Sequence, residues 1–145
     1  MKKLNKAIKI AAEIHTGNKG KKNEPAILHP IRVMLQMNDQ LSRTVAILHD
    51  VVESGKMTVD DLRNLGFNNK TCRAVDLLSR RKWESYDHYI KRVKTNKLAI
   101  KVKIADLEDN YNIKQNKKKL SKLDKSKINK YNRAYKKLTG KKLTS

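Results

Sequence analysis

The sequence predicts an all-α protein, a bundle of helices in a single domain. Apolar residues recur at helical spacing along most of the chain, and no stretch alternates polar and apolar residues over the length of a useful strand. The segments are joined by short polar connections, as in compact helical bundles. At 145 residues the chain is one domain that can bury a core, and with 38% hydrophobic but only 5% aromatic residues that core should be aliphatic.

The first four helices are marked by their ends. An amphipathic pattern near the N-terminus stops at Gly17, and a loop rich in Gly, Asn and Lys follows. Pro30 suits the first turn of the second helix, because proline lacks only an N–H that has no helical partner there. Residues 38–40 interrupt the pattern before a third, strongly apolar helix. Thr58, with Asp61 three residues later, predicts a capping box for a short fourth helix.

The later helices follow the same logic. Asn68 or Asn69 caps the fifth, and the polar block 79–84 separates it from the sixth. After Ile113 the apolar content falls and lysine dominates, so the last helix is only weakly amphipathic. The predicted helices cover residues 3–16, 30–37, 41–53, 58–66, 69–78, 85–94, 98–113 and 123–138.

The formal net charge of +21 would attract any polyanion at moderate salt. The lysines are dispersed over the whole chain, and the pattern shows no aromatic platform on which nucleobases would stack. Most of the charge is therefore expected on solvated faces, and weak nonspecific nucleic-acid binding is the competing interpretation. A small substrate rich in phosphate is compatible with both interpretations of the charge.

The chain shows no sign of a membrane or secretory destination. No segment is long and apolar enough to cross a bilayer, and the N-terminus lacks the apolar block of a signal peptide. Cys72 has no second cysteine with which to form an internal disulfide. These features predict a cytoplasmic protein without a membrane partner, and they leave its oligomeric state open.

The chemistry is concentrated in the third predicted helix, where His49 and Asp50 interrupt an apolar run and Glu53 follows one turn later. Taken alone, such a His-Asp pair is more often a hydrogen-bonded pair than a metal site. Two further candidates, His29 and Asp106, stand in equally apolar helical settings. Two imidazoles and two carboxylates would make a mixed nitrogen and oxygen set, which suits a divalent transition metal.

Four segments in this order resemble the HD-domain metal-dependent phosphohydrolases, and more narrowly the hydrolase part of RelA/SpoT-type alarmone enzymes and their small stand-alone relatives. They are HTGN at 15–18, EPAILHP at 24–30, ILHDVVE at 47–53 and VKIADLEDN at 102–110. The resemblance extends over residues 7–113. It implies an HD-domain helical bundle over residues 1–113 and a Lys-rich C-terminal extension over 114–145, with one helix packing on or flanking the core.

The resemblance also implies roles for individual residues. One divalent metal, reported in the family as manganese, would be bound by His29, His49, Asp50 and Asp106. Glu53 matches an acid that orients or deprotonates the attacking water. Asn110, one turn past Asp106, would line the sugar of a nucleotide. Apart from the resemblance, the spacing of Lys103, three residues before Asp106, puts it on the same helix face, where it either reaches a substrate phosphate or remains a solvated lysine.

The sequence departs from the alarmone hydrolases at three positions. Ser54 replaces the second acid of the catalytic pair, and a hydroxyl cannot act as a base at neutral pH. Gly20 stands where an arginine stacks on guanine, and Ala26 replaces a tyrosine. Three lysines flank Gly20, namely Lys19, Lys21 and Lys22. They could bind phosphates, but an ammonium group cannot stack on guanine as a planar guanidinium does.

Other charged residues near these motifs are expected to have lesser roles. The cluster 80–82 forms either a basic loop that closes over an anionic ligand or a plain solvated turn. Glu108 and Asp109 are expected to face outward or to pair with nearby lysines.

The function expected is metal-dependent hydrolysis of a nucleotide, with removal of the 3′-pyrophosphate from guanosine 3′,5′-bis(diphosphate) as the first substrate. Gly20 and Ala26 favour the alternative of another nucleotide or a dinucleotide phosphate. A third possibility, supported by Ser54, is a basic nucleic-acid-binding protein that retains the scaffold with weak activity.

Overall fold

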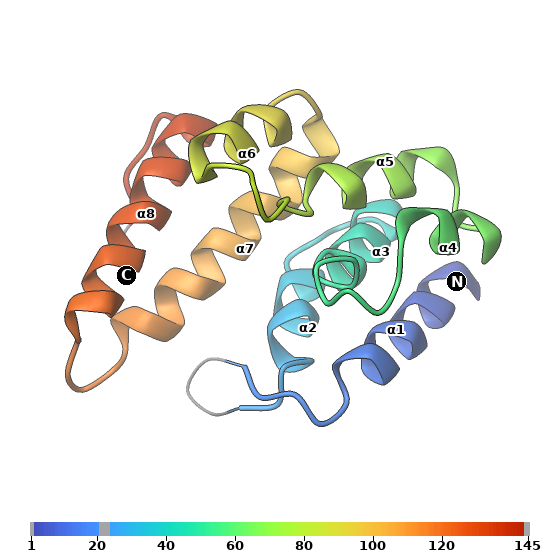
Figure 1. The fold of residues 1–145 in the computed structure, drawn as a ribbon, viewed down its shortest axis with the longest axis horizontal. Helices are drawn as coiled ribbons and strands as arrows, with labels where there is room; N and C mark the ends of the chain where they lie inside the picture. The colour runs from blue at the N-terminus through green and yellow to red at the C-terminus, as the bar shows by residue number, and fades with distance from the viewer. Residues whose placement is uncertain (1, 21–23, 144–145) are drawn as a thin grey trace.

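The computed structural model describes residues 2–20 and 24–143, and within these ranges the chain forms eight α-helices and no strand (Figure 1). The predicted all-α class is confirmed. The helices are α1 (Lys2–His15), α2 (Leu28–Leu35), α3 (Gln40–Leu48), α4 (Val59–Asn64), α5 (Asn69–Leu77), α6 (Tyr86–Val93), α7 (Lys97–Gln115) and α8 (Lys122–Thr139). Apart from the end of α3, they differ from the predicted ranges by no more than two residues at either end. No helix in the described ranges has the length and apolar character needed to cross a membrane.

Helix α3 is the centre of the bundle. It packs against α1, α2, α5 and α7, and its side chains from Val45 to Leu48 are fully buried. Residues that line it from the neighbouring helices are aliphatic, as the composition predicts, and include Ala11, Val33, Val75 and Val102. The apolar run around the His-Asp pair is therefore the core of the protein.

Helix α7 crosses the molecule between the two groups of helices seen in Figure 1. It contacts α2, α3 and α5 on one side and α6 and α8 on the other. Because it has partners on both sides, it buries residues around most of its circumference, including the charged Lys103 and Asp106. This is how two ionisable side chains come to lie in the interior.

Side-chain caps define the helix starts. The predicted capping box of α4 is confirmed, with the Thr58 hydroxyl and the Asp61 carboxylate each accepting a backbone N–H of the other residue. Asn68 caps α5 through the Thr71 N–H at 2.9 Å. Each such cap contributes roughly 1 kcal/mol to helix stability, and their positions explain why the predicted starts are accurate.

The prediction that the third helix continues to Glu53 is wrong, because α3 ends at Leu48. The next N–H in an uninterrupted helix would be that of Asp50, donating to the carbonyl of Ala46. That carbonyl instead accepts from the side-chain Nδ1 of His49 at 2.6 Å and from the His49 backbone N–H. Residues 49–54 consequently form turns, and Glu53 reaches its place through these turns rather than through helical spacing.

The central packing of α3 makes a direct stability prediction. Leu48→Ala should lower the free energy of unfolding by about 2–5 kcal/mol, because Leu48 is 0% exposed and its removal leaves a cavity. Urea titration followed by far-UV circular dichroism measures this. Leu35→Ala, at a position 68% exposed on the neighbouring helix, should change the unfolding free energy by no more than about 0.5 kcal/mol. Equal losses in the two variants would contradict the central position of α3.

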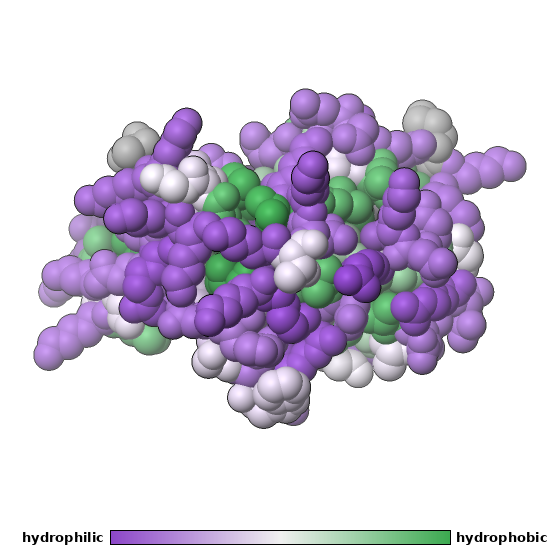
Figure 2. Space-filling view, turned by 90° about the horizontal axis from the view of Figure 1, so that it is seen from above, coloured by the Kyte–Doolittle hydropathy of each residue, from purple (hydrophilic) through white to green (hydrophobic). Residues whose placement is uncertain are grey.

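Polar side chains cover most of the face shown in Figure 2, with apolar side chains exposed in separate patches. This distribution agrees with lysines spread over solvated faces. The exposed large hydrophobic residues of the described ranges are Leu28 and Leu35 at the two ends of α2, Trp83 in the loop between α5 and α6, and Leu123 in α8.

Candidate metal centre and active-site cleft

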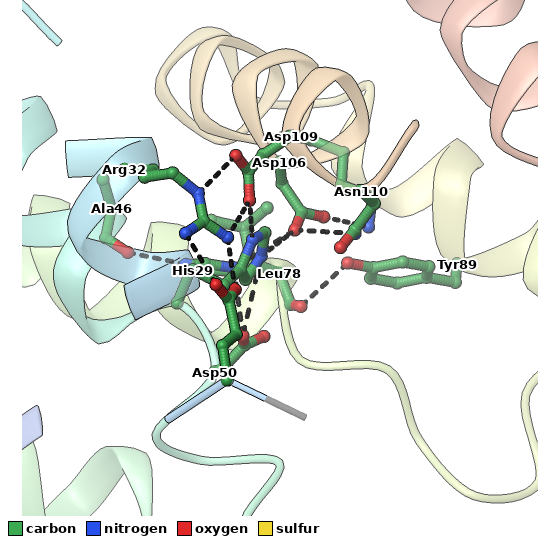
Figure 3. Close-up of polar contacts among 12 residues, drawn as sticks. His29, Arg32, Ala46, Asp50, Leu78, Tyr89, Asp106, Asp109 and Asn110 are labelled. Carbon is green, nitrogen blue, oxygen red and sulfur yellow. Dashed lines mark hydrogen bonds and ion pairs between the residues drawn. The ribbon is translucent and has the colours of Figure 1, made fainter. Parts of the chain in front are cut away.

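Four side chains that are far apart in the sequence meet beside α7. His29 comes from the first turn of α2, His49 and Asp50 from the turn that directly follows α3, and Asp106 from the middle of α7. Asp106 Oδ1 lies 2.7 Å from Nε2 of His29 and 3.3 Å from Nε2 of His49. Asp50 Oδ2 lies 4.0 Å and 3.3 Å from the same two nitrogens. Figure 3 shows the His29, Asp50 and Asp106 side chains converging.

The donor set fits a divalent metal. A carbonyl only accepts hydrogen bonds, so the Nδ1 of His49 that contacts Ala46 carries hydrogen, and the lone pair of the neutral ring lies on Nε2. This Nε2 is buried without a hydrogen-bond partner. One ligand atom each of His29, His49 and Asp50 lies within 4.8 Å of the others. A buried acceptor without a partner costs stability, and a cation bound between these atoms would remove that cost.

The carboxylates around the two imidazoles also favour a bound cation. Burial alone would lower the pKa of His29, but hydrogen bonds to Asp106 and Asp109 outweigh it and raise the pKa to about 10. For His49, burial again opposes the charge of Asp50, and the net effect is a raised pKa. Protons and metal ions compete for the same imidazole nitrogens, so a field that retains a proton also attracts a cation.

Asp106 is held by two further residues of α7. The ammonium of Lys103 donates to its Oδ2 at 2.7 Å, and the amide of Asn110 donates to its Oδ1 at 3.2 Å. Burial would raise the pKa of Asp106, but the Lys103 charge and the two imidazoles hold it well below its usual range. Burial would likewise lower the pKa of Lys103, and Asp106 instead holds it well above the usual range. Both groups are therefore charged.

The prediction that Asp109 faces outward or pairs with a nearby lysine is wrong. Its carboxylate accepts from Nδ1 of His29 at 2.6 Å and from Nε of Arg32 at 2.7 Å. The sequence does carry a signal for this, because Asp109 follows Asp106 by one helical turn and so shares its face of α7. Glu108 is exposed, as expected.

The metal-binding candidates form the floor of a cleft of about 580 Å³. One wall is the loop between α5 and α6, which contributes Arg80, Arg81 and Lys82. The opposite wall is α8, which contributes Lys127 and Lys130. The cleft is thus strongly cationic, and it matches an anionic ligand.

Aromatic rings also line this cleft. Tyr86 and Tyr89 contact each other edge to face, with ring centroids 5.7 Å apart, and Tyr131 lies on the α8 wall. The expectation that no aromatic platform accompanies the lysines is therefore wrong for this region. Tyr131 and Lys127 were not identified from the sequence as site residues, although their spacing of one helical turn places them on one face of α8.

Glu53 and its neighbour Ser54 have different surroundings. Glu53 lines the cleft, where its Oε1 accepts the backbone N–H of Arg80 at 2.6 Å. The residue as a whole is exposed, yet its carboxyl group is enclosed by the cleft, and this burial raises its pKa. Ser54 does not line the cleft, since its hydroxyl donates to the Val51 carbonyl and accepts the Lys56 N–H.

The predicted lysine loop is only partly described. Lys19 is exposed and forms an isolated antiparallel bridge with Pro25, away from the cleft. Lys21 and Lys22 lie outside the described residues. Gly20 and Ala26 line a smaller cavity, of about 180 Å³, on another side of His29.

Two buried side-chain atoms of residues around this smaller cavity have no hydrogen-bond partner. They are Nε2 of His15 and Oδ1 of Asn110, and both residues line the cavity. Burial lowers the pKa of His15, so its ring is neutral near pH 7. The small residues Gly20 and Ala26 leave this space open beside the metal-binding candidates.

Comparison with known proteins places the fold. No family model matches the sequence. A solved structure of a metazoan ortholog of SpoT, which hydrolyses ppGpp and plays a role in starvation responses, superposes with a TM-score of 0.82. The alignment covers 98% of this chain and 88% of that one, at 22% sequence identity. The chain therefore shares the helical fold of this ppGpp-hydrolysing protein, in agreement with the resemblance of its motifs.

Proposed function

We propose that this protein is a metal-dependent phosphohydrolase of a nucleotide, and that its first candidate substrate is guanosine 3′,5′-bis(diphosphate), from which it removes the 3′-pyrophosphate. The observation that carries the proposal is the unpartnered Nε2 of buried His49, which faces Asp50 and Asp106 on the floor of a cationic cleft. The ppGpp hydrolysis described for the structural neighbour supports the choice of substrate.

In this proposal His29, His49, Asp50 and Asp106 hold one divalent ion, with Mn²⁺ as the first choice. Such an ion lowers the pKa of a bound water and neutralises charge on phosphoryl oxygens. Mixed imidazole and carboxylate ligands suit Mn²⁺, as they do other transition metals.

Glu53 is the proposed general base. Among the described residues that line the cleft, it is the carboxylate outside the metal-binding set. It takes the proton of the attacking water as the new P–O bond forms and the bond between phosphorus and the 3′ oxygen breaks. The departing 3′ oxygen takes a proton from solvent water and becomes the 3′-hydroxyl of the nucleotide product. The Arg80 N–H fixes the carboxylate in place. Because the Ser54 hydroxyl is engaged with backbone groups, we assign it no proton transfer.

The cationic walls are the proposed phosphate-binding surface. Lys103 lies beside Asp106 and would contact the scissile phosphates, while Lys127 and Lys130 would contact phosphates farther from the metal. Asn110 would contact the sugar. Lys19 lies outside both cavities, so we assign it no contact with substrate. In this scheme the Lys-rich extension, residues 114–145, contributes a wall of the site to the core formed by residues 1–113.

The open cavity beside Gly20 and Ala26 favours a second candidate, hydrolysis of another nucleotide or of a nicotinamide dinucleotide phosphate. A substrate panel separates the candidates. The protein, purified in high salt to remove nucleic acid, is incubated with ppGpp, NADPH and nucleoside triphosphates, with and without Mn²⁺. We expect Mn²⁺-dependent release of pyrophosphate from ppGpp. If Mn²⁺ binds but no nucleotide is hydrolysed, and the protein binds added nucleic acid with steep salt dependence, it is a nucleic-acid-binding protein instead.

The α8 wall makes a prediction about substrate affinity. The double variant Lys127→Met/Lys130→Met should raise KM for ppGpp about tenfold with little change in kcat, because it removes charge-assisted contacts that do not change during the reaction. Steady-state kinetics measures this. Lys122→Met/Lys125→Met removes the same charge from exposed positions of α8 and should leave KM unchanged. Equal effects of the two variants would mean that only the overall charge matters.

A further inference from the structure

A chain of ion pairs extends from His29 away from the metal-binding candidates. Nδ1 of His29 contacts Asp109 Oδ2 at 2.6 Å, and Asp109 also accepts from the Arg32 guanidinium, from Nε at 2.7 Å and from a terminal nitrogen at 3.1 Å. The guanidinium in turn donates to both carboxylate oxygens of Glu24, at 2.5 and 3.1 Å. Figure 3 shows Arg32 and Asp109 on the side of the His29 ring opposite Asp50.

This arrangement follows from the register of two helices. Arg32 lies one turn after His29 on α2, and Asp109 lies one turn after Asp106 on α7. The two helices therefore present two successive cross-helix pairs. The first, His29 with Asp106, belongs to the metal-binding set, and the second, Arg32 with Asp109, lies directly beside it.

Each atom of Asp109 that could reach a cation already has a partner. Oδ2 accepts from His29 and Arg32, and Oδ1 accepts from Arg32. The imidazole ring lies between Asp109 and Asp106, because each carboxylate contacts a different nitrogen of that ring. Asp109 is thus placed to act on His29 rather than on a metal.

We propose that Asp109 is a positioning residue of the metal centre, which holds His29 with hydrogen on Nδ1 and the lone pair of Nε2 directed at the cation, and that Arg32 and Glu24 hold Asp109 in turn. This inference rests on the proposed role of His29 as a ligand. Carboxylates contact both ring nitrogens, Asp109 at Nδ1 and Asp106 at Nε2. With a cation between Nε2 and Asp106, the Asp109 carboxylate, which only accepts hydrogen bonds, would keep the hydrogen of the neutral ring on Nδ1. It also makes Nε2 a stronger donor to the metal and removes the ring's rotational freedom.

Arg32 has a second effect, on charge. Asp50, Asp106 and Asp109 all lie near His29, and an unneutralised third carboxylate would be repelled by the other two. The guanidinium neutralises Asp109 through two charge-assisted hydrogen bonds, from Nε at 2.7 Å and from a terminal nitrogen at 3.1 Å. Glu24 fixes the guanidinium from the loop that precedes α2.

The test is Mn²⁺ affinity, measured by calorimetry on folded protein, in wild type and in Asp109→Ala. We expect the dissociation constant to rise about 10- to 100-fold, which is the usual effect of removing such an outer partner of a metal ligand. Asp109→Asn keeps an acceptor oxygen but loses the charge, so it should fall between the two. Arg32→Met should also weaken binding. The matched control is Glu108→Gln, the adjacent exposed carboxylate, which should bind Mn²⁺ as wild type does.

The outcomes separate the two proposals. If wild type itself binds no divalent ion, the proposed function fails. If wild type binds Mn²⁺ and folded Asp109→Ala binds it equally well, the positioning role of Asp109 is overturned while the metal site stands. Should Asp109→Ala fail to fold, the nearly isosteric Asp109→Asn decides, because an affinity equal to that of Glu108→Gln overturns the proposal in the same way.

Discussion

Asp50→Ala is expected to abolish both stoichiometric Mn²⁺ binding and Mn²⁺-dependent hydrolysis. Asp50 contributes a carboxylate close to both imidazoles, 3.3 Å from Nε2 of His49 and 4.0 Å from Nε2 of His29. Its side chain is 37% exposed, so the substitution removes a ligand without opening a core cavity. Metal content by mass spectrometry and phosphate release from ppGpp measure the two losses.

The control for this variant is Asp60→Ala, which removes the same charge from a side chain that is 84% exposed on α4. It should bind metal and hydrolyse substrate as wild type does. Full Mn²⁺ binding by Asp50→Ala would show that Asp50 is not a ligand. Metal loss with unchanged turnover would refute the metal-dependent mechanism altogether.

The parts of the fold that the sequence predicts well are those set by local interactions. The start of α5 at Asn68 depends on one side chain bonding a backbone N–H three residues away, so a short window of sequence contains the whole interaction. The end of α3 shows the opposite case. It depends on the His49 ring taking the carbonyl of Ala46, and an apolar helical pattern gives no information on which way that ring turns.

The candidate site likewise has a part that the sequence predicts and a part that only the tertiary structure shows. The convergence of His29, His49, Asp50 and Asp106 was expected from their motifs, and the structure brings them together. The roles of α8 and of Asp109 were missed for a physical reason. Lysines are dispersed throughout this chain, so composition cannot separate the cleft-lining Lys127 from solvated ones.

Asp109 illustrates how a tertiary contact changes the meaning of a local pattern. By spacing it belongs to the same face of α7 as Asp106, but an acidic residue beside another acidic residue is ordinarily solvated. The positions of His29 and Arg32 on α2 make burial of this further carboxylate favourable, because both side chains contact it. The contact depends on how α2 packs against α7, which the local sequence around Asp109 does not contain.

Glu53→Gln is expected to lower kcat by about 10²- to 10⁴-fold, the range for loss of a general base, with Mn²⁺ affinity and KM little changed. The amide keeps the size of the side chain and an oxygen that can accept the Arg80 N–H. It cannot take a proton from water. Steady-state kinetics at saturating Mn²⁺ measures the effect, and Glu13→Gln, at an exposed position on α1, should retain wild-type kcat.

The pH dependence of kcat gives a second measure of the same residue. A base must be deprotonated to act, and burial raises the pKa of Glu53 above its usual 4.5. Wild-type kcat should therefore fall as the pH is lowered through this raised pKa, at Mn²⁺ concentrations that keep the metal bound. The residual activity of Glu53→Gln should lack that acid limb. If the variant keeps both wild-type kcat and the acid limb, the group that titrates is another one, and proton transfer from the water must be assigned elsewhere in the cleft.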